Sequence, residues 1–260
     1  GASVSLVHTF SRASRVMNPM VLSDPDQRFR PVSETAPYDY DLTISGQGLT
    51  WGWDLGLLWR PTPSLRLGAS FSSGSAVTMK GPVTLVGPDG RTQESTHTTT
   101  MVLPFTLKAG VNWQFVDDFE IAADVVWWHY QVFQEQRSVL STPLLGIAEF
   151  RDPKRFGNSV LWNVGLTYHI RRDIELMMGF QMDFSPTPTA TYAIESPARD
   201  SQGVAAGFRW QATDRLRVGA ALNRIWFDLT DIQDSRTTPP TNAKGYGGMV
   251  YFGADVSYRL

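Results

Sequence analysis

Apolar and polar residues alternate in two runs within residues 104–133, and a short polar break separates the runs. One face of the first run carries Leu107, Ala109, Val111, Trp113 and Phe115, and one face of the second carries Phe119, Ile121, Ala123, Val125 and Trp127. A period of two is typical of a β-strand with one apolar face. The break at residues 116–118 is Val-Asp-Asp, so the segment predicts a β-hairpin. Each run is about ten residues long, which is the length that a tilted strand needs to cross a bilayer.

The same alternation returns along the rest of the chain and predicts about ten strands of membrane-spanning length. The further runs are residues 2–10, 48–60, 65–71, 160–170, 174–184, 204–212, 216–226 and 250–260. The connections alternate strictly between short polar turns and long polar segments, which we expect to be loops. The long segments are residues 11–38, 72–103, 134–159, a stretch that starts at 185, and 227–246. Short turns on one side and long loops on the other are typical of outer-membrane barrels, whereas a soluble β-sandwich mixes its connection lengths.

Charged residues are nearly absent from the apolar faces of these runs. Because 18% of the chain is charged, chance would place roughly nine charges on the roughly fifty apolar-face positions, but only Arg224 lies there. A charge at the middle of a bilayer costs about 2–4 kcal/mol, so a lipid-facing surface excludes charges. The opposite faces do carry charges, including Asp54, Asp124 and Asp183, which we expect to pair with Arg or Lys in a lumen. A soluble core would exclude charges too, so this pattern alone leaves both interpretations open.

The aromatic residues favour the membrane barrel. One group lies beside the short turns or the chain end: Trp59, Trp113, Phe115, Phe119, Tyr168, Trp210 and Tyr258. A second group lies toward the long loops: Trp51, Trp53, Phe71, Trp127, Trp162, Phe180 and Trp226. The two groups are about eight residues apart along tilted strands, or roughly 20 Å, close to the height of the apolar band of a transmembrane barrel. A soluble core has no reason to sort its aromatic residues into two rings.

Composition excludes several other classes. The chain has 260 residues, a formal net charge of −2 and no cysteine, so it lacks the basic surface of a nucleic-acid-binding protein and any disulfide or thiolate site. No apolar run is long enough for a transmembrane helix. The four histidines, His8, His97, His129 and His169, are scattered, so we expect no metal site and no cofactor. We also expect no catalytic residues, because no clustered acid–base or nucleophile–base set is visible.

A transport function would need an apolar site inside or above the barrel. The candidate apolar residues come from the long segments and their borders: Met101, Val102, Leu103, Phe105, Leu140, Leu144, Leu145, Phe150, Trp226 and Phe227. The alternative is that these residues pack the loops against each other. If the cargo is a fatty acid, its carboxylate requires a cation, and Arg66, Lys108 and Arg209 are the candidates expected to face the lumen. The predicted ligand site therefore comprises Met101, Leu103, Phe105, Lys108, Phe150, Arg209, Trp226 and Phe227.

In the order of its segments the chain resembles the FadL/TodX family of outer-membrane transporters. WGWDLGLLWRPTPSLRLGASFSSG (residues 51–74) is similar to a strand–turn–strand segment of that family. LPFTLKAGVNW with FEIAADVVWWHYQVF resembles its Leu-Pro-led strand followed by an Ala-Asp-rich strand. MMGFQMDFSPTPTA is similar to its strand ending in Asp-x-Ser-Pro-x-Pro. SQGVAAGFRWQATDRLRVGAALNRIWFD and the closing YFGADVSYRL follow in the family order.

The resemblance implies an all-β, antiparallel transmembrane β-barrel in the bacterial outer membrane, with residues 1–260 as one domain. Members of the family have fourteen strands and an N-terminal plug. This chain matches about ten C-terminal strands, with the plug absent. The implied function is passive transport of hydrophobic molecules, most of all long-chain fatty acids, by a monomer surrounded by outer-membrane lipid. The alternatives are a barrel-anchored protease or lipase, and a structural or adhesive barrel whose loops bind a partner.

Overall fold

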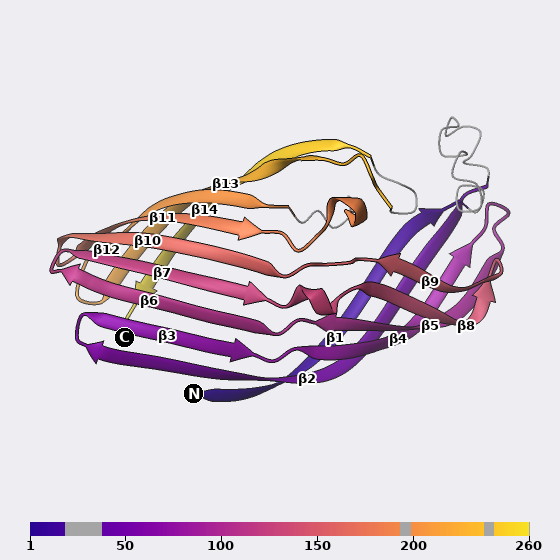
Figure 1. The fold of residues 1–260 in the computed structure, drawn as a ribbon, viewed down its shortest axis with the longest axis horizontal. Helices are drawn as coiled ribbons and strands as arrows, with labels where there is room; N and C mark the ends of the chain where they lie inside the picture. Colours follow the sequence, from indigo (N-terminus) through magenta and orange to yellow (C-terminus); the bar gives the residue numbers. More distant parts are fainter. Residues whose placement is uncertain (19–37, 193–198, 237–241, 260) are drawn as a thin grey trace.

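The computed structural model describes all residues except 19–37, 193–198, 237–241 and 260. Fourteen antiparallel strands form a single curved sheet with the order β14-β13-β12-β11-β10-β7-β6-β3-β2-β4-β5-β8-β9, and β1 pairs with the free side of β2. Within the described residues this path does not return from β1 or β9 to β14, so the sheet is open (Figure 1). In the described connections, two single-turn 3₁₀ helices are formed by Tyr130–Val132 and Thr189–Thr191. No helix in the described part of the chain is long and apolar enough to span a membrane.

The ten runs predicted from the sequence are all strands, and together we call them the wall. They are β1 (Ala2–Met17), β2 (Tyr40–Thr62), β3 (Leu65–Ser72), β6 (Thr106–Val116), β7 (Phe119–Trp128), β10 (Ser159–Arg171), β11 (Ile174–Phe184), β12 (Ser201–Gln211), β13 (Leu216–Asp231) and β14 (Lys244–Tyr258). The short turns between β2 and β3, β6 and β7, and β10 and β11 lie together at the left edge of Figure 1. The long connections leave the opposite edge, so the predicted alternation of short and long connections is confirmed.

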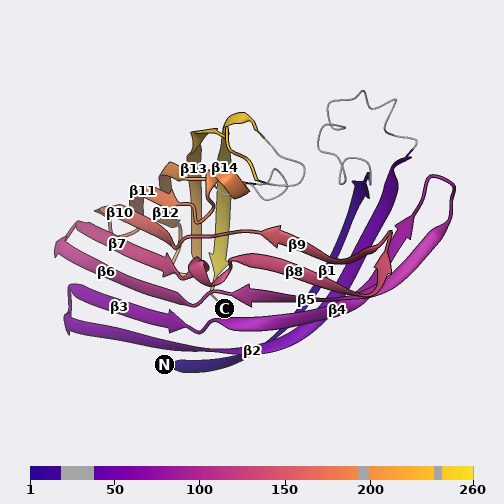
Figure 2. The ribbon, with the colours of Figure 1, turned by 45° about the vertical axis from the view of Figure 1, so that its right-hand side comes forward.

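Two segments expected to be loops form strands instead. Residues 72–103 hold the hairpin of β4 (Ser75–Val86) and β5 (Thr92–Leu103), and residues 134–159 hold the hairpin of β8 (Glu135–Leu144) and β9 (Ile147–Pro153). β4 pairs with the first half of β2, while β3 pairs with its second half. The sheet therefore continues beyond the wall (Figure 2). We call β4, β5, β8, β9 and the adjoining halves of β1 and β2 the arm.

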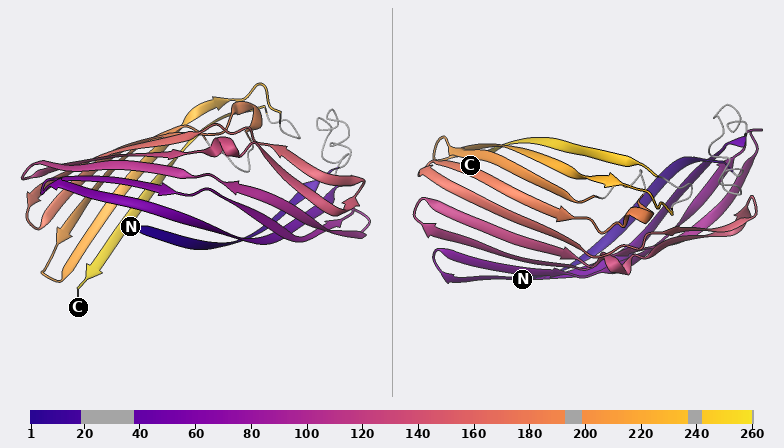
Figure 3. Two further views of the ribbon diagram at one scale, coloured as in Figure 1. Left: turned by 60° about the horizontal axis from the view of Figure 1, so that its bottom comes forward. Right: turned by 45° about the horizontal axis from the view of Figure 1, so that its top comes forward.

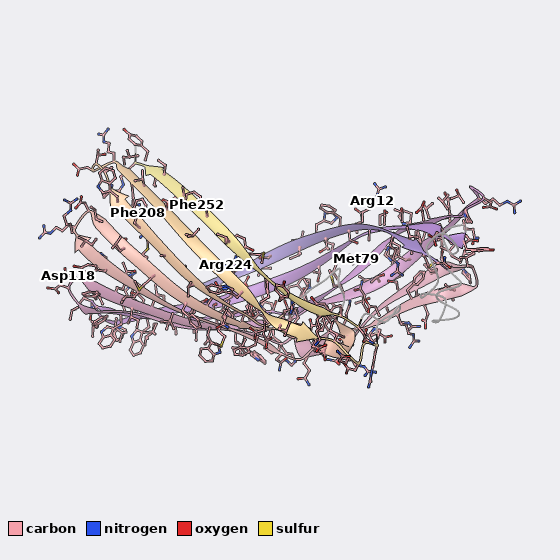
Figure 4. All side chains as sticks on the ribbon, turned by 90° about the horizontal axis from the view of Figure 1, so that it is seen from above. Arg12, Met79, Asp118, Phe208, Arg224 and Phe252 are labelled. Atoms are coloured by element: carbon pink, nitrogen blue, oxygen red, sulfur yellow. The ribbon has the colours of Figure 1, made fainter. Side chains whose placement is uncertain are left out.

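The arm has a hydrophobic core on one of its faces. Met17, Leu42, Val83, Leu85, Leu140 and Leu144 form this core and are all at least 94% buried. Tyr40, Ile44, Leu145 and Phe150 pack against it. The guanidinium of Arg15 on β1 lies 5.9 Å from the ring centre of Phe150 on β9, although four strands separate β1 from β9 in the sheet. The arm is thus curled on itself, and it splays away from β10–β14 when the molecule is seen from above (Figure 4).

A buried histidine lies on the same face of the arm, and its side chain reaches from β5 across β4 to β2. His97 on β5 is 4% exposed, and its register partner on β4 is Gly81. Its Nε2 donates to the carbonyl of Ser45 on β2 (3.1 Å), and its Nδ1 lies 2.8 Å from the hydroxyl of Thr99. A Cβ on Gly46 would lie only 2.9 Å from the imidazole, so glycine is what allows the ring to reach across β4.

Candidate functional site

The two faces of the wall differ in chemistry, and the strand register decides which residues share a face. In an antiparallel sheet, directly paired residues point to the same side. One row of pairs runs Gly68, Gly110, Asp124, Asn163, Gln181 and Gly203, and the next runs Arg66, Asn112, Ala122, Gly165, Gly179, Ala205 and Asn223. These rows form the inner face of the curved wall. Glycine, alanine and small polar residues therefore cover its middle, and they leave space in front of it.

The inner face is hollowed over the small residues. A hollow of about 930 Å³ lies against β2, β3, β6 and β7. Gly56, Gly68, Gly110 and Ala122 form part of its floor, with Leu58 and Val126 as apolar lining. A second hollow of about 280 Å³ continues over Gly165, Gly179 and Gly203 on β10, β11 and β12. The two hollows share Ala122, Asp124 and Asn163, so they form one continuous depression.

Two cations line the larger hollow without an acidic partner. Arg66 on β3 and Lys108 on β6 are exposed and lie in the wall of the hollow. Among the described residues, neither side chain forms an ion pair or a hydrogen bond. The nearby carboxylates are already engaged by amides. Asp124 accepts a hydrogen bond from Asn163 (2.7 Å), and Glu120 accepts one from Asn112 (2.7 Å). The two positive charges are therefore available to an anionic group in the hollow.

Arg209, the third cation candidate, has a partner. Its Nη1 donates to Glu175 on β11 at 2.9 Å, and the other oxygen of Glu175 lies 3.7 Å from Nδ1 of His169 on β10. The register places these three residues in one row near the short turns. This pairing leaves Arg209 less available to a ligand than Arg66 and Lys108.

The expectation that Asp54, Asp124 and Asp183 pair with Arg or Lys is wrong: among the described residues none of them forms an ion pair. Asp54 instead accepts a hydrogen bond from Ser3, and Asp124 accepts one from Asn163.

The outer face carries two chains of aromatic contacts. Near the short turns, Trp113, Phe115, Phe119 and Tyr168 contact one another in sequence, with ring centres 4.6–6.1 Å apart. Toward the long connections, Trp53, Phe71, Phe105, Trp127 and His129 do the same, at 4.8–5.7 Å. The two bands contain seven of the residues predicted to form the two aromatic rings. Such bands are typical of the two interfaces of a membrane.

The eight residues predicted to bind ligand do not come together. Lys108 lines the larger hollow, and Arg209 lies near the short turns. Phe105 contacts Phe71 and Trp127 in an outer aromatic band, and Trp226 stands on the outer face, where the guanidinium of Arg224 lies 5.6 Å from its ring centre. Figure 4 labels Arg224 on β13. Phe150 packs on the arm core. Met101 and Leu103 lie on β5, and Phe227 lies on β13.

Other candidates from the long segments are packing residues. Leu140 and Leu144 belong to the arm core, and Leu145 packs against it, as the alternative of loop packing expects. The glycines and amides of the inner face were missed by the sequence analysis. Their signal was present, because Gly68, Gly110 and Asn163 occupy polar-face positions of their runs. What the sequence did not show is that these positions form continuous rows across the strands.

Comparison with known proteins places this geometry in a family. The family model described as outer membrane protein transport protein (OMPP1/FadL/TodX) matches residues 1–260. No curated protein matches the chain significantly. The crystal structure of a Pseudomonas aeruginosa FadL homologue is similar with a TM-score of 0.73 and 18% identity, covering 98% of this chain and 62% of that one. The Pseudomonas putida toluene transporter TodX has a TM-score of 0.68 and 18% identity, covering 99% of this chain and 65% of that one.

A third solved structure, the CymD monoaromatic hydrocarbon channel, has a TM-score of 0.63 and 13% identity and covers 99% of this chain and 68% of that one. The chain thus spans less than two thirds of the length of the first two structures, and at such low identity the likeness shows the fold alone. The match of the family model over the whole chain goes further, because its members are outer-membrane transport proteins rather than enzymes. The all-β fold, the two aromatic bands and this match agree, and the chain belongs to the outer-membrane OMPP1/FadL/TodX family.

Proposed function

We propose that this protein takes part in passive transport of hydrophobic molecules across the outer membrane, and that its cargo is a long-chain carboxylate such as a fatty acid. The family supports the first half of the proposal. The second half is carried by one observation, the pair of unpartnered cations Arg66 and Lys108 beside a hollow floored by glycine and alanine. A carboxylate binds a cation through charge-assisted hydrogen bonds, which are stronger than hydrogen bonds between neutral groups.

The wall around the cations suits a slender apolar chain. Gly56, Gly68 and Gly110 present no side chain, so an acyl chain can lie close to the sheet. Leu58 and Val126 add apolar contact in the same hollow. Transport would be passive, because the sequence contains no phosphate-binding loop that would indicate use of a nucleotide.

The test compares uptake of radiolabelled palmitate and of toluene by cells that express the whole protein. The R66Q/K108Q variant removes both charges, and we expect palmitate uptake to fall by about tenfold while toluene uptake is unchanged. The K108R variant keeps the charge and should retain palmitate uptake. R171Q, at a short turn where Arg171 pairs with Asp173, is the matched control for loss of a positive charge.

Toluene is the competing cargo, because TodX is named as a toluene transporter and CymD as a monoaromatic hydrocarbon channel. If R66Q/K108Q takes up palmitate normally, the carboxylate site is wrong. If cells with the protein take up toluene but no palmitate, an uncharged aromatic cargo replaces the fatty acid. If neither compound enters faster than in cells without the protein, the transport proposal itself fails.

A further inference from the structure

The outer face of β1, β2 and β4 changes from apolar to cationic along the strands. On β1 the outward residues run Leu6, His8, Phe10 and then Arg12, and Phe10 is 80% exposed. On β2 they run Trp51, Leu49, Gln47 and Ser45, paired with Leu6, His8, Phe10 and Arg12. The register between β1 and β2 is unbroken from Ala2 to Met17, so Arg12 lies on the same face as the apolar residues before it. The outward apolar surface is continuous with the aromatic band, and the cation follows it directly.

A second cation lies beside the first. Lys80 on β4 pairs with Gln47 on β2, whose partner on β1 is Phe10, so Lys80 faces outward just as Arg12 does. The alternating burial of β4 agrees, since Met79 is 4% exposed and Lys80 is exposed. Two strand spacings separate β1 from β4, so the two backbones are roughly 10 Å apart. Both side chains are long enough to reach one ligand from the two sides.

No outward carboxylate of β1, β2, β4 or β5 lies close to this pair of cations. Neither Arg12 nor Lys80 forms an ion pair or a hydrogen bond within the described residues. The outward carboxylates of neighbouring strands lie farther from the wall. Asp41 on β2 is four residues beyond Ser45, and Glu94 on β5 is four residues beyond Thr98. Four residues of strand are roughly 13 Å. On these strands the cations thus occupy the part of the outer face next to the apolar surface, and the acids lie beyond them. Glu149 on β9 lies in the same register row as Lys80, but Arg137 and Arg151 bind its carboxylate.

Hydroxyl groups surround Lys80 on the same face. Thr98 is its direct partner on β5, and the hydroxyls of Thr78 and Thr100 lie 3.1 Å apart on β4 and β5. All three side chains are exposed. Threonine hydroxyls both donate and accept hydrogen bonds, as sugar hydroxyls do. We call Arg12, Lys80, Thr78, Thr98 and Thr100 the outer polar patch.

We propose that the outer polar patch binds a phosphorylated glycolipid of the outer leaflet, of the lipid A type. The long connections of a transmembrane barrel lie on the extracellular side, so the patch is at the level of the outer-leaflet head groups. Arginine and lysine bind phosphate through charge-assisted hydrogen bonds. The threonines suit the sugar that carries the phosphates, and the apolar outer face below contacts the acyl chains. This inference is independent of the transported cargo, because the patch lies on the opposite face from the inner hollow.

The test uses the whole protein in nanodiscs of uncharged phosphatidylcholine, titrated with fluorescent diphosphoryl lipid A. We expect R12Q/K80Q to bind lipid A about 25-fold more weakly, because each of the two cations near an anionic lipid surface contributes about fivefold to binding. R91Q is the matched control, since Arg91 lies near the tip of the same hairpin, paired with Asp89 and far from the wall. Heat-dependent mobility on gels checks that each variant is folded.

Two further measurements decide the chemistry. Dephosphorylated lipid A should bind wild-type protein as weakly as diphosphoryl lipid A binds R12Q/K80Q, and 0.5 M salt should weaken binding of the diphosphoryl form. Phosphatidylglycerol should compete poorly unless Thr78, Thr98 and Thr100 are all replaced by alanine. If R12Q/K80Q binds lipid A as tightly as the wild type, or if R91Q loses as much affinity as R12Q/K80Q, the assignment of the site is wrong. If phosphatidylglycerol competes with lipid A for the wild-type protein as well as unlabelled lipid A does, the assignment of the ligand as a glycolipid is wrong. If R12Q/K80Q does not fold, salt-insensitive binding by the wild type contradicts the proposal.

Discussion

The wall and the arm belong to one sheet, but they are stabilised in opposite ways. In the wall, large apolar residues such as Trp51, Leu57 and Phe252 face outward, and glycine and small polar residues face inward. In the arm, the inward face carries the buried Leu42, Val83 and Leu85, and the outward face carries Thr, Lys and Arg. β2 runs through both parts, as the two views of Figure 3 show. The surroundings of a strand, lipid or water, therefore decide which of its faces is apolar.

Truncation of a core side chain in the arm should have the largest effect on stability. Leu85→Ala should destabilise the arm by about 2–5 kcal/mol, because it leaves a cavity among tightly packed neighbours. The same truncation on the wall, Leu222→Ala, should cost about 2.4 kcal/mol at most, since lipid fills the space and only the transfer term is lost, without a cavity term. Hydrogen exchange of the β4–β5 amides measures the first effect. Equal costs at both sites would contradict the assignment of the outer face of the wall to lipid.

A charge on the outer face of the wall should be the next most damaging change. Val164 lies in the middle of β10 and points outward, so Val164→Arg should cost about 2–4 kcal/mol in a bilayer. Thr167→Arg is the inner-face control, because Thr167 pairs with Glu120 on the hollowed side. Thr98→Arg makes the same change on the outer face of the arm, where polar head groups and water replace the hydrocarbon, and should cost little. Unfolding by urea in lipid vesicles gives the three values, and the ranking fails if Thr98→Arg costs as much as Val164→Arg.

His97→Leu tests the polar part of the arm core. The substitution keeps the volume roughly constant but takes the imidazole partner from the Ser45 carbonyl and from the Thr99 hydroxyl, which keeps its contact with the Ser138 hydroxyl. The expected cost is about 1–3 kcal/mol. Thr98→Ala is the neighbouring control on the exposed face and should change stability by less than about 0.5 kcal/mol. Hydrogen exchange of β5 is the measurement. A neutral or stabilising His97→Leu would show that the imidazole bonds add nothing.

The smallest expected effect is the acid sensitivity of the β8–β9 hairpin. Arg151 and Arg137 hydrogen-bond the carboxylate of Glu149 and hold the pKa of Glu149 below its ordinary value. A carboxylate whose pKa is lowered by folding stabilises the folded form above its ordinary pKa, and this contribution is lost as the pH falls through the lowered pKa. Digestion of the hairpin by pepsin should therefore accelerate below about pH 4 in the wild type. Glu149→Gln should remove this pH dependence, and a persistent dependence would implicate another group.

The sequence predicted the wall because lipid imposes a simple rule on it. Each wall strand alternates between a lipid-facing apolar residue and a small or polar one, and the predicted runs match β6, β7, β10 and β11 within two residues at each end. β5 was not predicted because its buried face is polar. It carries Ser95, His97 and Thr99, whose side chains form hydrogen bonds in the arm. β4 did carry the alternation, in Val77, Met79, Val83 and Leu85.

The candidate site was less predictable because it depends on pairing across strands. Lys108 and Arg209 look alike in the sequence, since both lie at polar-face positions of their runs. Only the register shows that Arg209 meets Glu175, whereas Lys108 lies opposite Ser70 and Val126. Phe105 and Trp226 were candidates because of their apolar character, and their direction, outward, follows from the local backbone and the register. The period of a strand gives its faces, but the partners of a side chain come from the order of the sheet.

The unbroken pairing of β1 with β2 has a consequence for how the chain assembles. A slip of one residue would turn Val4 and Leu6 toward the lumen at one end and Arg12 toward the arm core at the other. A slip of two would keep the faces but would move Arg12 to the register row of Phe10, two residues nearer the hydrocarbon. Lipid and water therefore select the same register from the two ends of one hairpin. Slipped registers of β1 against β2 would therefore be disfavoured by the membrane itself, without a specific side-chain contact between the two strands.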